Sequence, residues 1–147
     1  MKNEIIFGLS GSGKTGYLVD KISKFIDNNE NYLIVILEED SEILHRLPEN
    51  YKNNSHIIFK SGFEEMLLEG INNKINKKLL FIIDDKLKNN CDMYLSHLIN
   101  LLTYYGNVLI TVQLNKENKN ISEIKPVLIN NHLNFNFSNF INIFLNK

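Results

Sequence analysis

A glycine-rich segment near the start of the chain restricts the possible folds more than any other stretch. Residues 8–15 read Gly-Leu-Ser-Gly-Ser-Gly-Lys-Thr, which fits the pattern G-x-x-x-x-G-K-[ST] at every fixed position. The apolar run Ile5–Phe7 precedes this segment, and a helical pattern follows it. A strand, a glycine-rich loop and a helix in this order form the setting in which the pattern binds phosphate. The segment therefore predicts an α/β fold with an anion site in the loop.

Each position of this loop, the P-loop, has an expected role in holding a nucleotide. Gly8, Gly11 and Gly13 allow the backbone to curl so that its N–H groups point inward, and the helix that follows adds the positive end of its dipole. We expect Lys14 to reach the β- and γ-phosphates and the Thr15 hydroxyl to ligate Mg²⁺. The expected nucleotide-binding residues of the loop are Gly8, Ser10, Gly11, Ser12, Gly13, Lys14 and Thr15.

Two later strands end in polar residues that fit the same chemistry. The apolar run Leu79–Ile83 leads directly into Asp84 and Asp85. We expect Asp84 to hold the Mg²⁺ shell and Asp85 to orient or deprotonate the attacking water. Gln113 follows the apolar run Val108–Val112, and it could lie beside the acidic pair if the two strands are neighbours. We interpret Gln113 as a catalytic candidate that would contact the γ-phosphate or the water.

The periodicity of apolar residues predicts a single domain over residues 1–147, with about five to six mainly parallel strands flanked by helices. Ser61 and Glu64 have the spacing of a capping box, and Gly106 suits a helix C-terminal cap. The apolar tail that contains Phe140 must pack on the core or on a neighbour. The predicted strands cover 2–7, 32–37, 56–59, 79–83, 108–112 and 133–137, and the predicted helices cover 15–27, 43–47, 63–71 and 94–105.

Composition narrows the class of protein further. Sixteen Lys and Arg residues against seventeen Asp and Glu residues leave a net charge of −1, so no overall basic character favours nucleic acid. The single Cys91 forms no disulfide framework, and the four His show no ligand spacing, so we expect no zinc site. No apolar run reaches membrane-spanning length, and the first residues lack a signal-peptide pattern. We expect a cytoplasmic protein without a membrane partner.

The order of these signatures resembles that of a known family. A P-loop, a strand with Asp84-Asp85, a helix and a strand that ends in Gln113 together resemble the FtsK/HerA superfamily of DNA-translocating ATPases. Within it, the chain is most similar to viral genome-packaging ATPases of the poxvirus kind. A weaker likeness covers Ile124–Phe137, where relatives tend to have a proline and a final strand.

The resemblance implies a RecA-like (ASCE) P-loop NTPase sheet in which the Gln113 strand lies between the P-loop strand and the Asp84 strand. It implies ATP and Mg²⁺ as cofactors, with hydrolysis stimulated by double-stranded DNA. It also implies a homo-oligomeric ring that could work with a viral portal or capsid component in the host cytoplasm.

The chain departs from these relatives in its arginine content. Such motors usually place an arginine from a neighbouring subunit on the γ-phosphate, yet Arg46 is the only arginine and follows the second strand. Lys116, Lys119 or Lys125 could replace it as a point charge, although lysine lacks the planar fork of arginine. The other consequences that we consider are slow hydrolysis and a function other than that of a motor.

Three alternatives stay open. A nucleotide-dependent adaptor would bind ATP with little turnover, and the scarcity of arginine favours it. A small-molecule kinase would share the P-loop, but it would usually crowd several arginines around a phosphorylated acceptor. A GTPase would need the guanine signature N-K-x-D, and residues 115–118 read Asn-Lys-Glu-Asn instead.

Overall fold

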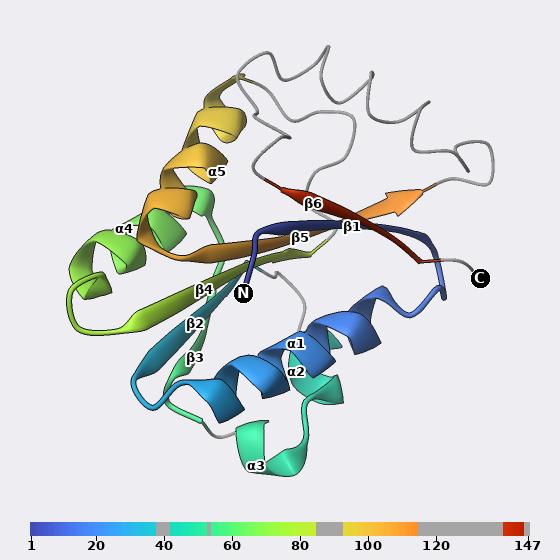
Figure 1. Ribbon diagram of the computed structural model, residues 1–147, viewed down its shortest axis with the longest axis horizontal. Helices are drawn as coiled ribbons and strands as arrows, with labels where there is room; N and C mark the ends of the chain where they lie inside the picture. The colour runs from blue at the N-terminus through green and yellow to red at the C-terminus, as the bar shows by residue number, and fades with distance from the viewer. Residues whose placement is uncertain (38–41, 53, 85–92, 115–139, 146–147) are drawn as a thin grey trace.

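The computed structural model describes residues 1–37, 42–52, 54–84, 93–114 and 140–145. Six strands form one sheet in the order β3-β2-β4-β5-β1-β6, and every neighbouring pair is parallel (Figure 1). This confirms the predicted α/β architecture with a parallel sheet. The strands are β1 (Glu4–Leu9), β2 (Tyr32–Leu37), β3 (Ile57–Lys60), β4 (Lys78–Asp84), β5 (Asn107–Leu114) and β6 (Ile141–Leu145).

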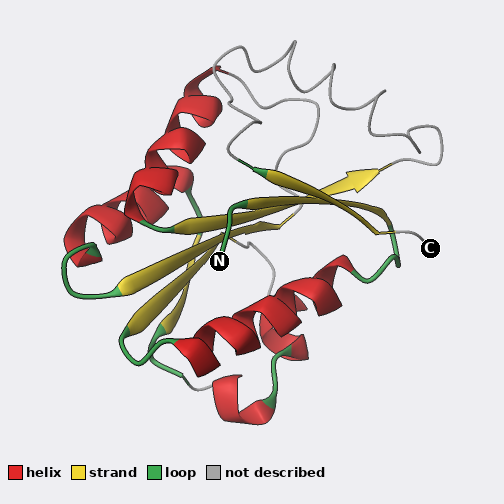
Figure 2. Cartoon of the chain, in the orientation of Figure 1, coloured by secondary structure: helices red, strands yellow, loops and turns green. Residues whose placement is uncertain are grey.

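Helices cover both faces of the sheet (Figure 2). On one face lie α1, α2 and α3, and on the other lie α4 and α5 (Figure 1). Helices connect parallel strands in α/β proteins, because the chain must return from the carboxyl end of one strand to the amino end of the next. The helices are α1 (Lys14–Asn28), α2 (Glu42–Arg46), α3 (Glu49–Lys52), α4 (Phe63–Asn73) and α5 (Met93–Tyr105).

The apolar runs of the sequence explain why the central strands are buried. All six residues of β2 are buried, and so are the five apolar residues Leu79–Ile83 of β4. Successive side chains of a strand point to opposite faces, so a strand covered on both faces must be apolar throughout. A short continuous apolar run between polar turns therefore predicted each of these strands.

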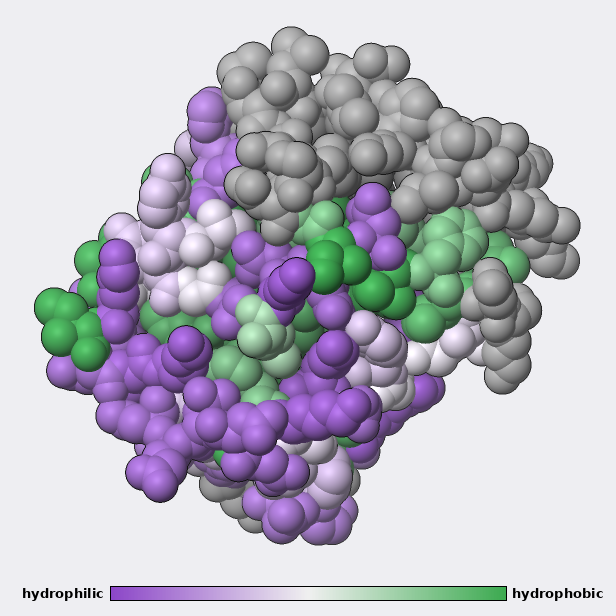
Figure 3. Space-filling view, viewed as in Figure 1, coloured by the Kyte–Doolittle hydropathy of each residue, from purple (hydrophilic) through white to green (hydrophobic). Residues whose placement is uncertain are grey.

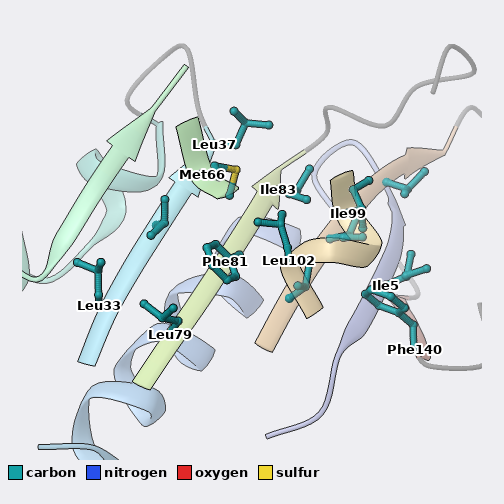
Figure 4. Close-up of a cluster of buried hydrophobic side chains, with 14 of the residues drawn as sticks. Ile5, Leu33, Leu37, Met66, Leu79, Phe81, Ile83, Ile99, Leu102 and Phe140 are labelled. Atoms are coloured by element: carbon teal, nitrogen blue, oxygen red, sulfur yellow. The ribbon is translucent and has the colours of Figure 1, made fainter. Parts of the chain in front are cut away.

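The core consists of two hydrophobic clusters, one on each face of the sheet. On the α4/α5 face, Phe81 of β4 packs with Met66 of α4 and Leu102 of α5 (Figure 4). On the α1 face, Leu18 and Ile22 of α1 pack against the strand side chains that point to that face. The outer side of α1 is hydrophilic (Figure 3), as expected of an amphipathic helix that lies on a sheet.

Two details of the fold correct the expectations from sequence. The predicted capping box is wrong, because Gly62 occupies the N-cap of α4 without a side-chain hydrogen bond and Ser61 lies one residue earlier. Glu64 accepts a hydrogen bond from the Tyr94 hydroxyl at 2.6 Å instead. Gly106 does follow α5 as predicted, but its φ is not positive. It is needed because a Cβ there would lie 2.5 Å from the Leu79 carbonyl oxygen.

The end of the chain also differs from its predicted pattern. The strand expected over residues 133–137 lies outside the described residues, whereas β6 covers Ile141–Leu145 and pairs with β1. Phe144 of β6 stacks on Phe7 of β1 with ring centroids 6.2 Å apart. The apolar tail thus packs on the core, as one of the two predicted options. The polar segment around Pro48 contains the short helix α3, where only a turn was expected.

Candidate phosphate-binding site

The strand order brings three sequence signatures together at the carboxyl ends of neighbouring strands. These are the P-loop after β1, Asp84 of β4 and Gln113 of β5. In parallel strands all carboxyl ends lie on the same side, and β5 lies between β1 and β4, as the family resemblance implied. The register aligns Asp84 with Thr111, and Thr111 with Ile6. Neighbouring strands are about 4.8 Å apart, so Asp84 lies about 10 Å across the sheet from the strand that enters the P-loop.

The signatures also share one face of the sheet. Leu80 and Ile82 belong to the cluster beneath α1, so the alternation along β4 directs Asp84 to the α1 face. The same alternation along β5, from Leu109 through Thr111, directs Gln113 to that face. Because α1 begins at Lys14, the P-loop and the end of β4 that carries Asp84 lie at the same end of the strands and on the same face of the sheet.

The P-loop is a tight turn that requires its glycines. The Ser12 N–H donates to the Leu9 carbonyl oxygen at 3.0 Å, and Gly11 and Gly13 have φ values of 77° and 96°. These are left-handed conformations that side chains with a Cβ rarely adopt. A Cβ on Gly8 would collide with Ser12 Oγ and would lie 3.2 Å from Lys14 Cγ. A larger residue at position 8 would therefore occupy the interior of the loop, where the side chains of Ser12 and Lys14 lie.

Lys14 lies inside this loop with no carboxylate partner among the described residues. The residue is 6% exposed, and its Nζ donates to the carbonyl oxygens of Gly8 at 3.2 Å and Leu9 at 3.4 Å. Burial of a charged group is costly unless an opposite charge compensates it, and carbonyl dipoles compensate only in part. An anion in the loop would supply the missing charge.

Two further groups at the loop lack the partners that folded proteins usually provide. Ser12 Oγ is buried and makes no hydrogen bond with any described residue. The α1 N-cap, Gly13, offers no side-chain cap, and the first turn of α1 contains no acidic residue. The N–H groups of a first helical turn have no intrahelical acceptor. A phosphate would satisfy these donors together with Lys14.

The remaining predicted residues occupy the rim around the loop. Thr15 is half-buried in the first turn of α1, and Ser10 is exposed. Gln113 is exposed at the carboxyl end of β5, opposite Gly8 in the register. The predicted position of the Gln113 strand beside the Asp84 strand is confirmed, since β4 and β5 pair directly. Asp85, together with the candidate cations Lys116, Lys119 and Lys125, lies outside the described residues.

Thr111 is a polar group at this site that sequence reasoning missed. It is fully buried, and its Oγ1 lies 2.5 Å from Asp84 Oδ1. The available signal was a hydroxyl within the apolar run of β5, which becomes informative only once the register places it beside Asp84. Among the described residues, the Thr15 hydroxyl and the Asp84 carboxylate are the groups at this site that fit Mg²⁺. This is enough, because Mg²⁺ bound at phosphates needs only one or two protein carboxylates.

A contrasting polar cluster lies at the amino end of β1. Glu4 is buried, and it accepts hydrogen bonds from the Tyr17 hydroxyl at 2.8 Å and from Lys21 Nζ at 3.3 Å. Burial and the hydrogen bond to Glu4 raise the pKa of Tyr17 well above its usual value. Both partners belong to α1, so this cluster fixes the helix on the strand that carries the P-loop.

Within the described ranges, no group of three or more His, Cys, Asp or Glu side chains could hold a metal ion. Likewise, none of the described helices has the length and apolar character to span a bilayer. No protein-family model matches the sequence, and no curated protein matches it significantly.

Proposed function

We propose that this chain binds ATP with Mg²⁺ and hydrolyses it. The observation that carries the proposal is the buried Lys14 ammonium, whose only hydrogen-bond acceptors among the described residues are loop carbonyl oxygens. It lies next to Ser12 Oγ, which has no partner in that part of the chain. These groups surround the N-terminus of α1, and Asp84 lies at the same end of the strands and on the same face of the sheet. A triphosphate would provide the anionic partner for the lysine, and Mg²⁺ would link it to the carboxylate.

Each residue has a defined role in this proposal. Lys14 would exchange the carbonyl oxygens for the β- and γ-phosphates, while the loop N–H groups hold the remaining phosphate oxygens. Thr15 and Asp84 would hold Mg²⁺, which when bound would neutralise charge that develops on the γ-phosphate. Gln113 would orient the attacking water from the neighbouring strand end, and Asp85 would accept its proton.

We extend the proposal to a double-stranded DNA translocase that acts as a homo-oligomeric ring, with genome packaging as its setting. This part is supported by the order of signatures in the sequence and by the placement of β5 between β1 and β4. A ring would allow locally basic loops to face DNA although the net charge of one chain is −1. A viral portal or capsid protein would then be the partner that positions the ring.

ATP hydrolysis measured with and without double-stranded DNA tests the proposal, alongside the particle mass with ATP present. We expect phosphate release that DNA stimulates, together with an oligomer that forms on addition of ATP. Turnover that DNA leaves unchanged but a small acceptor stimulates would support the kinase alternative instead.

A nucleotide-dependent adaptor is the second candidate, and the position of Arg46 favours it. The only arginine of the chain ends the short helix α2, where we do not expect it to reach the γ-phosphate of a neighbouring subunit. Without such a cation the charge on the γ-phosphate is stabilised less well. ATP binding with Mg²⁺ but barely measurable hydrolysis, with or without DNA, would favour this candidate.

A further inference from the structure

The Thr111 hydroxyl stands out because apolar residues surround it in β5. Ile110 and Val112 on either side are buried, and Thr111 itself is 0% exposed. Burial of a hydroxyl without a partner costs about 1–3 kcal/mol in proteins, whereas a valine of the same shape would pack there without this cost. A threonine in this position therefore indicates that the hydroxyl has a specific acceptor.

The geometry identifies Asp84 as that acceptor. Thr111 Oγ1 donates to Asp84 Oδ1 across 2.5 Å, and the two residues are direct register partners on neighbouring strands. An ionised carboxylate can only accept, so the hydroxyl must be the donor. The branched Thr111 side chain has few χ1 rotamers in a strand, so its hydroxyl is a rigid support for the carboxylate.

We propose that Thr111 is a positioning residue that orients the Asp84 carboxylate toward the Mg²⁺ of a bound nucleotide. This inference rests on the proposed nucleotide binding. With Oδ1 held by Thr111, the carboxylate would meet the Mg²⁺ shell in one fixed orientation. Loss of a hydrogen-bond partner behind a metal ligand typically lowers metal affinity or activity about 10- to 100-fold.

The test compares Thr111→Val, which removes the donor at constant shape, with Thr111→Ser, which keeps it. Mn²⁺ replaces Mg²⁺ as the probe, and its affinity is measured by electron paramagnetic resonance in the presence of a non-hydrolysable ATP analogue. We expect Thr111→Val to weaken Mn²⁺ binding about 10-fold or more, while Thr111→Ser stays close to the wild type. Affinity for the analogue in EDTA should be the same for all three proteins, because the P-loop is unchanged.

Thr103→Val is the matched control. Thr103 donates to the Asn100 carbonyl oxygen within α5, so its replacement removes a threonine hydrogen bond away from the site. It should leave Mn²⁺ affinity unchanged even if the melting temperature falls. Unchanged Mn²⁺ affinity in Thr111→Val would overturn the inference and leave Thr111 as a link between β4 and β5.

Two further outcomes are separable. If Thr111→Val does not fold, Thr111→Cys replaces it, since a thiol is a weaker donor than a hydroxyl. Mn²⁺ should then bind less tightly to the cysteine variant than to Thr111→Ser, and equal affinities would contradict the inference. A wild-type protein that binds no analogue would instead refute the proposed nucleotide binding itself, before any comparison of variants.

Discussion

Charged side chains are buried at both ends of β1, and the two differ in the groups that surround them. At the amino end, Glu4 is paired with Lys21 and accepts from Tyr17, so the buried carboxylate is compensated within the fold. At the carboxyl end, Lys14 is equally buried, but within the described ranges its ammonium meets only carbonyl oxygens of its own loop. Both ends lie against the same helix, α1, so packing alone does not account for the contrast. We interpret the compensated charge of Glu4 as structural support, and the lack of a described counter-charge at Lys14 as support for the proposed ligand.

Asp85→Asn should produce the largest change in activity. Removal of a general base typically lowers the rate about 10²- to 10⁴-fold, while the P-loop, which we propose binds the phosphates, is untouched. We expect nucleotide to stay bound in a titration and phosphate release to be lost. Equal loss of binding and hydrolysis would argue against a catalytic role for Asp85.

Lys14→Ala should separate function from stability at the carboxyl end. Loss of the one charged group that we propose contacts the transferring phosphate should lower hydrolysis about 10²- to 10³-fold, by analogy with single donors that stabilise transition states. The melting temperature should stay the same or rise, because the change removes a buried ammonium that has no carboxylate partner in the part of the chain that the structure describes. Lys24→Ala on the exposed side of α1 is the control, since Lys24 pairs with Asp20 in solvent and should affect neither quantity.

Glu4→Ala should give the reverse result at the amino end. Its loss leaves the Tyr17 hydroxyl and the Lys21 ammonium without their acceptor, which should lower the free energy of unfolding by about 1–3 kcal/mol. ATP affinity should not change in the folded protein. Urea denaturation and a nucleotide titration measure the two quantities, and a variant of wild-type stability would contradict the structural role of this cluster.

Tyr17 should add a small dependence of stability on pH. Its pKa is raised in the folded protein by burial and by the hydrogen bond to Glu4, so the fold favours the protonated hydroxyl. The resulting stability is fully present below the unfolded pKa of about 10, and it is lost as pH rises above that value. The free energy of unfolding should therefore fall more steeply above pH 10 in the wild type than in Tyr17→Phe. Parallel pH profiles would show that Tyr17 makes no such contribution.

The sequence predicted local features far better than long-range ones. The bounds of β2 agree because its apolar run is continuous and ends at polar residues on both sides. The turn at Gly11 and Gly13 was predicted because a left-handed backbone strongly favours glycine, so the sequence itself indicates this conformation. In contrast, the capping box at Ser61 was wrong because the spacing alone does not fix where a helix begins.

Long-range pairing explains what sequence reasoning could not supply. The contact between Thr111 and Asp84 depends on strand order and register, which no local pattern encodes. The same holds for Gly106, whose small size is required by the Leu79 carbonyl oxygen on another strand rather than by its own backbone angles. The buried Ser12 Oγ likewise becomes visible only when the loop is closed in three dimensions.

The most direct test of the site is a calorimetric titration of a non-hydrolysable ATP analogue into wild type and Asp84→Asn, each with Mg²⁺ and with EDTA. We expect the wild type to bind more tightly with Mg²⁺, and we expect Asp84→Asn to lose this gain while its affinity in EDTA matches that of the wild type. Folded wild-type protein that ignores millimolar analogue, or an Asp84→Asn variant that keeps the full Mg²⁺ gain, would contradict a phosphate loop and a carboxylate that share one metal.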